Sequence, residues 1–88
     1  MIHPVKQCIE KTGLTHKAFA VLHVISLQRL KDCLYGYTSS IPQKIICVMI
    51  QNGFDEKEAQ AQYLKWRKWK VEQELIAPFA RKEGRLNP

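Results

Sequence analysis

The stretch THKAFAVLHVISLQRLKDCLYG, residues 15–36, decides the fold of this chain. Its apolar residues recur at the three- and four-residue spacing of buried helix faces, in two short segments. Thr15 and Ser26 are suitable N-cap residues, and Gly36 is a suitable helix end. The pattern predicts a helix over about 16–23, a tight turn, and a second helix that ends at Gly36. We expect the first of these helices to be well buried, because it is apolar on almost every side.

The flanking sequence predicts further helices and gives no strand pattern. Pro4 suits the first turn of a helix that Gly13 would end, and Pro42 suits the start of a helix that Gly53 would end. Asp55, followed by a glutamate three residues later, resembles a capping box that opens a long C-terminal helix. The expected fold class is therefore all-α, a compact domain of five helices.

The expected organisation is a single domain over residues 1–76 followed by a basic tail at 77–88. Within the domain, the two-helix pair lies at about 15–36 and the C-terminal helix at about 55–76. Short links between helices fit such a domain.

The chain is small and basic. Its 88 residues contain 14 Lys and Arg against 8 Asp and Glu, a net charge of +6. This excess favours a polyanionic partner such as nucleic acid, although a basic surface also serves plain solubility. A chain of this size often borrows buried surface from a second copy, so a homodimer is expected. Without a signal-like segment or an apolar run of about 20 residues, we expect a soluble cytoplasmic protein with no membrane partner.

The cysteines do not form a metal or disulfide pattern. Cys8, Cys33 and Cys47 lack CxxC spacing and lie in apolar helical stripes, so we interpret them as small buried hydrophobic residues in a reducing compartment. No nucleophile has a base and an orienting acid in a known motif, and no phosphate-binding glycine loop occurs. We therefore expect no enzyme activity, metal, cofactor or small-molecule effector.

The two helices within residues 15–36 have the features of a helix-turn-helix unit. Ala20 is small enough to let the helices cross closely, and Ile25, Leu30 and Cys33 would lock the second helix onto the core. The polar residues of the second helix then face outward. The open alternative is that this pair is only the middle of a small helical core.

Residues 5–53 resemble the DNA-binding domain of the lambda-repressor and Cro-type family, also called the XRE family. The residues that carry the resemblance are Ala20, Val24 at the position where glycine is usual, Ile25, Ser26, Leu30 and Gly36. The resemblance implies sequence-specific DNA binding, a homodimer on an operator, and repression of transcription. It also implies an origin in a phage, a plasmid or another mobile element.

Two residues depart from the family pattern. The glycine that Val24 replaces often has positive φ, which a β-branched residue disfavours, so we expect a wider or more helical turn. Leu34 stands where many members carry a glutamate that pairs with the first helix, and an apolar contact is expected in its place.

Four residues of the second helix are candidates for contacts with bases. Gln28 could pair with adenine, Leu27 could touch a thymine methyl, and Asp32 could accept a hydrogen bond from cytosine. Lys31 could bind guanine or phosphate. Each has a plainer alternative, which is core packing for Leu27 and a solvated helix surface for the others.

Phosphate contacts are expected from the segments that flank this helix, where helix N-termini and hydroxyl groups favour anions. The candidates are Thr15, His16, Lys17, Ser26, Arg29, Tyr37, Thr38, Ser39, Ser40 and Lys44. The alternative is that the hydroxyl groups are only caps and turn residues.

The C-terminal helix is rich in aromatic residues. Tyr63, Trp66 and Trp69 are predicted dimer contacts, because a core this small does not easily enclose all three. The alternative is a monomer that encloses them. The segment KWRKWK, residues 65–70, could follow a phosphate backbone, stack on exposed bases or lie on a membrane. The second functional hypothesis is a protein-interaction module that binds a partner through this helix.

Overall fold

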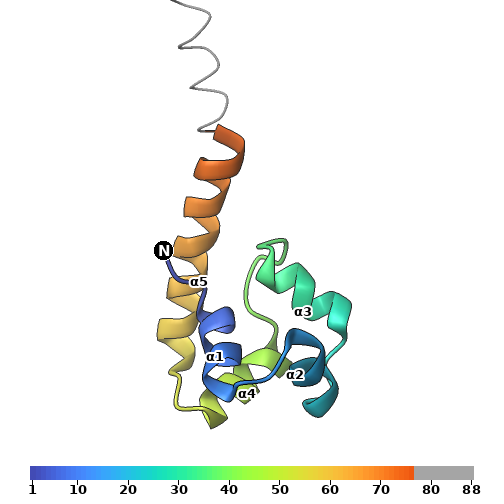
Figure 1. Ribbon diagram of the computed structural model, residues 1–88. Coiled ribbons are helices and arrows are strands. Elements are labelled where there is room, and N and C mark those ends of the chain that lie inside the picture. Colours follow the sequence, from blue (N-terminus) through green and yellow to red (C-terminus); the bar gives the residue numbers. More distant parts are fainter. Residues whose placement is uncertain (77–88) are drawn as a thin grey trace, which may run out of the picture.

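The computed structural model describes residues 1–76, and within them every regular element is a helix (Figure 1). The elements are α1 (Pro4–Thr12), α2 (His16–Leu22), α3 (Leu27–Leu34), α4 (Gln43–Gln51), α5 (Glu56–Val71) and one π-helical turn, η1 (Glu72–Ile76). The predicted all-α fold class is confirmed. None of the described helices is long and apolar enough to cross a membrane. The predicted basic tail lies outside the described residues.

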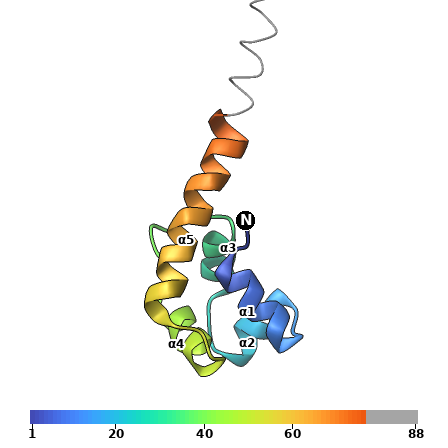
Figure 2. The ribbon, with the colours of Figure 1, turned by 90° about the vertical axis from the view of Figure 1, so that its left-hand side faces the viewer.

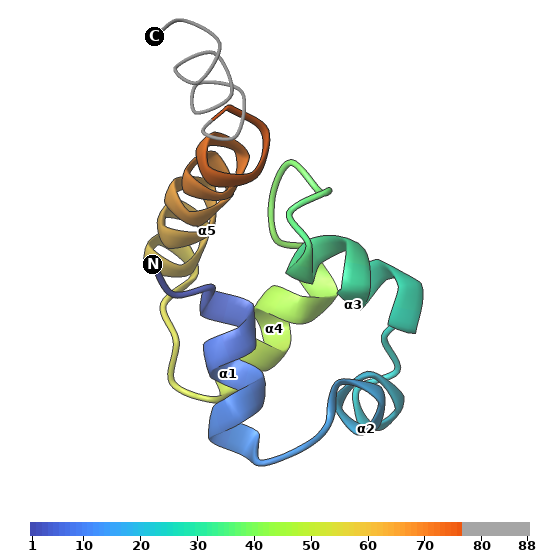
Figure 3. The same cartoon turned by 45° about the horizontal axis from the view of Figure 1, so that its top comes forward.

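The helices are arranged around α1 and α4. Figures 1 and 3 show α5 on one side of these two helices, and α2 and α3 on the opposite side. α5 contacts both α1 and α4. Its C-terminal end, together with η1, projects beyond the other helices (Figure 2). α2 and α3 thus lie at the edge of the domain away from most of α5.

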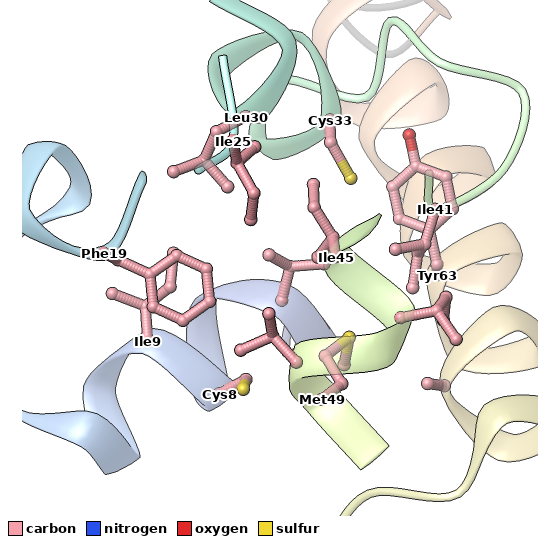
Figure 4. Close-up of a cluster of buried hydrophobic side chains, with 14 of the residues drawn as sticks. Cys8, Ile9, Phe19, Ile25, Leu30, Cys33, Ile41, Ile45, Met49 and Tyr63 are labelled. Carbon is pink, nitrogen blue, oxygen red and sulfur yellow. The ribbon is translucent and has the colours of Figure 1, made fainter. Parts of the chain in front are cut away.

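One hydrophobic core joins all five helices (Figure 4). Ile9 from α1, Phe19 from α2, Leu30 from α3, Ile45 from α4 and Tyr63 from α5 are all among its fully buried large side chains. Because each helix supplies part of the same core, the position of α3 depends on the packing of the whole domain.

The helix ends follow the predicted capping signals. Thr15 Oγ1, Ser26 Oγ and Asp55 Oδ2 each accept a hydrogen bond from the backbone N–H three residues later, at 3.1, 3.4 and 3.0 Å. Gly13 and Gly36 follow their helices with φ of 75° and 83°. Each of the three side-chain hydrogen bonds satisfies a backbone N–H that the helix itself leaves unpaired.

The prediction that α2 is well buried was wrong for half of the helix. Phe19 and Ala20 face the core, but Val21 is 71% and Leu22 is 64% exposed. A helix of seven residues completes only about two turns. A single face therefore meets the core, however apolar the opposite face is.

Cys47 is a second correction. Cys8 and Cys33 are buried as predicted, but Cys47 is an exposed free thiol on α4. The buried residues of α4 are Ile45, Ile46, Val48 and Met49, and this face is centred on Ile45 and Met49. Cys47 lies two residues from each of them, and such an offset on a helix points a side chain away from the shared face.

Tyr63 and Trp66 lie in the core of this chain, although we predicted them as contacts with a second copy. Tyr63 is fully buried and Trp66 is 8% exposed. The ring of His3 packs against both, with ring centroids 5.3 Å from Tyr63 and 4.2 Å from Trp66. The prediction was wrong because the segment before α1 packs over these two rings, and helical spacing within α5 does not reveal that contact. Of the three predicted dimer contacts, only Trp69 remains at the surface.

His3 ties the N-terminus to α3. Its Nδ1 accepts a hydrogen bond from the N–H of Val5 at 3.1 Å, so the neutral ring carries its proton on Nε2. That Nε2 donates to the carbonyl oxygen of Cys33 at 3.0 Å. Burial lowers the pKa of His3 below its ordinary value, and the charges of Lys70 and Lys6 act in the same direction.

Candidate nucleic-acid interface

The turn between α2 and α3 is compact, and our expectation of a wider or more helical turn at Val24 was wrong. Val24 has φ of 53°, the left-handed conformation that glycine usually supplies. Its N–H donates to Val21 O at 3.3 Å, and the N–H of Ile25 donates to Ala20 O at 2.8 Å. The two bonds form a Schellman motif. These bonds and the burial of Ile25 outweigh the preference of an isolated valine.

The crossing of α2 and α3 has the predicted packing. Ala20 is only 1% exposed, and the side chains of Ile25, Leu30 and Cys33 are buried in the common core. Burial also raises the pKa of the Cys33 thiol to about 11, so this cysteine is protonated at neutral pH and acts as a packing residue. With its inner face fixed in this way, α3 holds its outer face in one orientation.

The outer face of α3 is polar. Gln28, Arg29 and Lys31 are exposed, and Asp32 is half-buried. Gln28 Nε2 donates to Asp32 Oδ1 at 2.9 Å, so the amide and the carboxylate one helical turn apart are brought together. The face therefore presents two cations beside an amide whose orientation is set by a neighbouring acid.

The two leucines at the ends of α3 pack inward. Leu27 and Leu34 are half-buried and lie against the core. Core packing, the alternative considered for Leu27, accounts for this residue, and we do not propose it as a base contact. The apolar contact expected at Leu34 is present.

The start of α2 carries exposed candidates for phosphate contact. Thr15 Oγ1 serves as the N-cap, and His16 and Lys17 are exposed in the first turn. His16 also lines a surface pocket of about 500 Å³ that includes Tyr35 and Lys6. The N-terminal end of α2 and the C-terminal end of α3 therefore border the same hollow.

The loop after α3 contains one candidate whose hydroxyl is already used. The Tyr63 hydroxyl donates to Thr38 O at 2.7 Å and lies 2.9 Å from Thr38 Oγ1. Thr38 is thus a residue that holds the loop, and our prediction of it as a phosphate contact is withdrawn. Tyr37, Ser39 and Ser40 are exposed in the same loop, and Lys44 is exposed in the first turn of α4.

α5 contributes two basic residues of the segment KWRKWK, for which we predicted contacts with a partner and no role within the fold. Arg67 Nε donates to Gly36 O at 2.8 Å, and Lys70 Nζ donates to Tyr35 O at 2.9 Å. Cations that bind the carbonyl groups at the end of a helix satisfy unpaired acceptors and oppose the negative end of the helix dipole. Half of the cations in the 65–70 segment therefore anchor α3. Arg67 and Lys70 follow Tyr63 by four and seven residues, so they share a helix face with this buried residue. That spacing was the signal that could have placed them against the rest of the fold.

The described part of the chain offers no arrangement for metal chemistry. Among residues 1–76, no group of three or more His, Cys, Asp or Glu side chains could hold a metal ion.

Comparisons with known proteins do not assign this chain to a family. No protein-family model, curated protein or solved structure matches it. The resemblance to the lambda-repressor family therefore rests on the residues of the 5–53 segment alone, and the function has to be argued from the site.

Proposed function

We propose that this chain binds duplex DNA in a sequence-specific manner through the outer face of α3 and acts as a transcriptional repressor. The observation that carries the proposal is the α2–turn–α3 unit, in which a fixed inner face leaves Gln28, Arg29 and Lys31 exposed on the outer face. A recognition helix in the major groove needs this combination of a locked inner face and a polar outer face.

Gln28 is the proposed reader of adenine. An amide group has two N–H donors and one carbonyl acceptor. One N–H is bonded to Asp32, which leaves the second N–H and the carbonyl oxygen for the bidentate pair with adenine. Asp32 then acts as a positioning residue for Gln28, and Lys31 and Arg29 supply contacts to guanine or phosphate.

The protein is proposed to act as a homodimer on a partly palindromic operator. Dimers of helix-turn-helix proteins place two recognition helices about one DNA turn apart. With Tyr63 and Trp66 enclosed in the core, Trp69 is the remaining aromatic candidate for the contact. The other exposed apolar side chains of α5, Leu64 and Val71, lie on a different side of the helix from Trp69. Light scattering that gives the mass of one chain, 10.3 kDa, at micromolar concentration would count against the dimer.

A gel-shift titration against the DNA upstream of the protein's own gene tests the proposal. We expect a shift that weakens steeply between two salt concentrations, because binding releases counterions from phosphates. Gln28→Ala should weaken the free energy of binding to the preferred sequence by about 1–3 kcal/mol and should change binding to unrelated DNA little. Lys44→Ala, at a phosphate candidate, should weaken both kinds of DNA alike. The absence of a shift at low salt would refute the proposal.

A protein-interaction module remains the second candidate. The exposed apolar side chains of Leu64, Trp69 and Val71 on α5 favour it, because such side chains are common at protein contacts. In that case Trp69→Ala abolishes partner binding and Gln28→Ala has no effect. The two variants therefore separate the two candidates.

A further inference from the structure

Two exposed tyrosines stand beside each other where α3 ends. Tyr35 is 52% and Tyr37 is 74% exposed, and their ring centroids are 5.9 Å apart with an angle of 51° between the planes. Exposed aromatic faces of this kind serve as stacking platforms for bases. Neither ring is needed to close the core, which already encloses Tyr63 and Trp66.

Two cations lie close to these tyrosines, one over the Tyr35 ring and one on the backbone of Gly36. Lys70 Nζ is 5.4 Å from the centroid of the Tyr35 ring, and Arg67 binds the backbone between the two tyrosines through its Nε. A guanidinium group has five N–H donors, so the single bond to Gly36 leaves the donors of its two terminal nitrogens for another acceptor. Aromatic faces and phosphate-binding groups are thus provided by the same few residues.

A surface pocket of about 400 Å³ joins these groups, and we name it the tyrosine pocket. Its lining includes Tyr35, Tyr37, Arg67, Lys70, Val71 and Glu74. The volume falls in the range of small-ligand sites, which suits one nucleotide. Glu74 Oε1 is 4.0 Å from Lys70 Nζ and is the acidic member of the lining.

We propose that the tyrosine pocket binds an unpaired base of a single-stranded nucleic acid. The base stacks on the exposed face of Tyr37, and its phosphate meets Arg67 and Lys70. A base paired inside a duplex does not expose its faces, so this site selects single strands. The site lies between the end of α3 and α5, so it contains none of the proposed base-reading residues and shares only Tyr37 with the candidate phosphate contacts.

Glu74 has a specific place in this proposal. Its carboxylate neutralises part of the charge of Lys70 and repels an incoming phosphate. The acid therefore weakens the site for every polyanion, while the tyrosines favour the strands that carry bases. The repulsion by Glu74 and the stacking on the tyrosines can therefore be measured separately.

Fluorescence anisotropy at low salt tests the proposal with two labelled strands of equal length. One is a single strand of ten thymidine nucleotides. The other is a strand of ten abasic nucleotides, which has the same sugar-phosphate backbone and no bases. Because bases stack favourably on an aromatic ring, we expect the thymidine strand to bind about tenfold more tightly. Tyr37→Ala should remove this preference, and Tyr37→Phe should preserve it because the ring is kept. Glu74→Gln should tighten binding of both strands.

Equal affinity for the two strands, or an undiminished preference in Tyr37→Ala, would overturn the proposal. Loss of strand binding in Gln28→Ala with no effect of Tyr37→Ala would overturn it as well, since it would place the strand on α3. A duplex measured in parallel separates this site from the duplex-reading proposal. There, Tyr37→Phe weakens binding if the hydroxyl group contacts phosphate, although it leaves stacking on a single strand intact.

Discussion

Replacing Val24 by glycine should stabilise the protein, although the change removes an aliphatic side chain. Val24 has φ of 53°, and left-handed backbone costs a residue with a Cβ atom about 1–2 kcal/mol. Glycine removes this strain but adds about 0.4–1 kcal/mol of conformational entropy to the unfolded chain. The valine side chain is 77% exposed, so its removal takes little packing from the folded state.

The balance of these contributions is a gain of about 1 kcal/mol in the free energy of unfolding. For a domain of this length the gain corresponds to a rise of about 4–8 °C in Tm. Urea denaturation followed by circular dichroism measures the change. Val24→Asn should give a smaller gain, because asparagine tolerates the left-handed region better than a β-branched residue does.

Gly13→Ala is the matched control. Gly13 has φ of 75°, and a Cβ atom built on it would meet no atom within 4 Å. The substitution adds about 1–2 kcal/mol of backbone strain, which the lower entropy of the unfolded chain offsets by about 0.4–1 kcal/mol, so it should cost about 1 kcal/mol. If Gly13→Ala is destabilising and Val24→Gly is neutral or destabilising, the strain that we assign to Val24 is refuted.

Three further consequences concern the core and the anchoring of α3. Because the pKa of His3 is lowered in the folded state, its contribution to stability is complete above the unfolded pKa of 6.5 and is lost as the pH falls from there towards the folded value. His3→Asn should flatten this part of a stability profile measured from pH 7.5 to 5, and identical slopes would contradict the assignment. Arg67→Ala should lower the free energy of unfolding by about 1–2 kcal/mol, because the carbonyl group at the end of α3 loses its charged donor; an unchanged urea midpoint would argue against this role. In native protein a thiol reagent should modify Cys47 rapidly, while Cys8 and Cys33 react only on unfolding. Equally fast modification of all three thiols would contradict the burial pattern.

The helix boundaries could be predicted because their signals are local. Thr15, Ser26 and Asp55 each satisfy a backbone N–H three residues away, so the cap depends on few distant contacts. Gly36 meets a local requirement as well, since its φ of 83° suits a residue without a Cβ atom. These signals are sufficient to place helices along the chain, and they carry no information about which helices meet.

The turn at Val24 could not be predicted from the preference of one residue. A β-branched side chain opposes left-handed backbone, and that preference is all that the sequence displays at this position. The outcome depends on two backbone hydrogen bonds and on the burial of Ile25, which exist only once α2 and α3 are packed. Tertiary contacts of this kind can hold a residue in a conformation that it would avoid alone.

The aromatic residues of α5 show the same limit at longer range. Helical spacing placed Tyr63 and Trp66 on one face correctly, but it could not show that the ring of His3 closes over them. The segment before α1 is 60 positions away from Tyr63 in sequence, and no periodicity connects them. Their assignment as dimer contacts failed for this reason, whereas the outer face of α3 followed directly from the helix period.

The contacts of α5 also bear on how α3 would act on a polyanion. Lys70 and Arg67 hold the C-terminal end of α3, and Gln60 holds the start of α4 through two hydrogen bonds with the backbone of Ile41, at 2.9 and 3.0 Å. Both ends of the loop that leaves α3 are therefore attached to one rigid helix. The N-terminal end of α3, which carries Gln28, is fixed instead by the strained turn and the core. A change in α5 should thus shift the loop and the tyrosine pocket more than the proposed base-reading residues, so the two proposed binding activities should respond separately to substitutions in this helix.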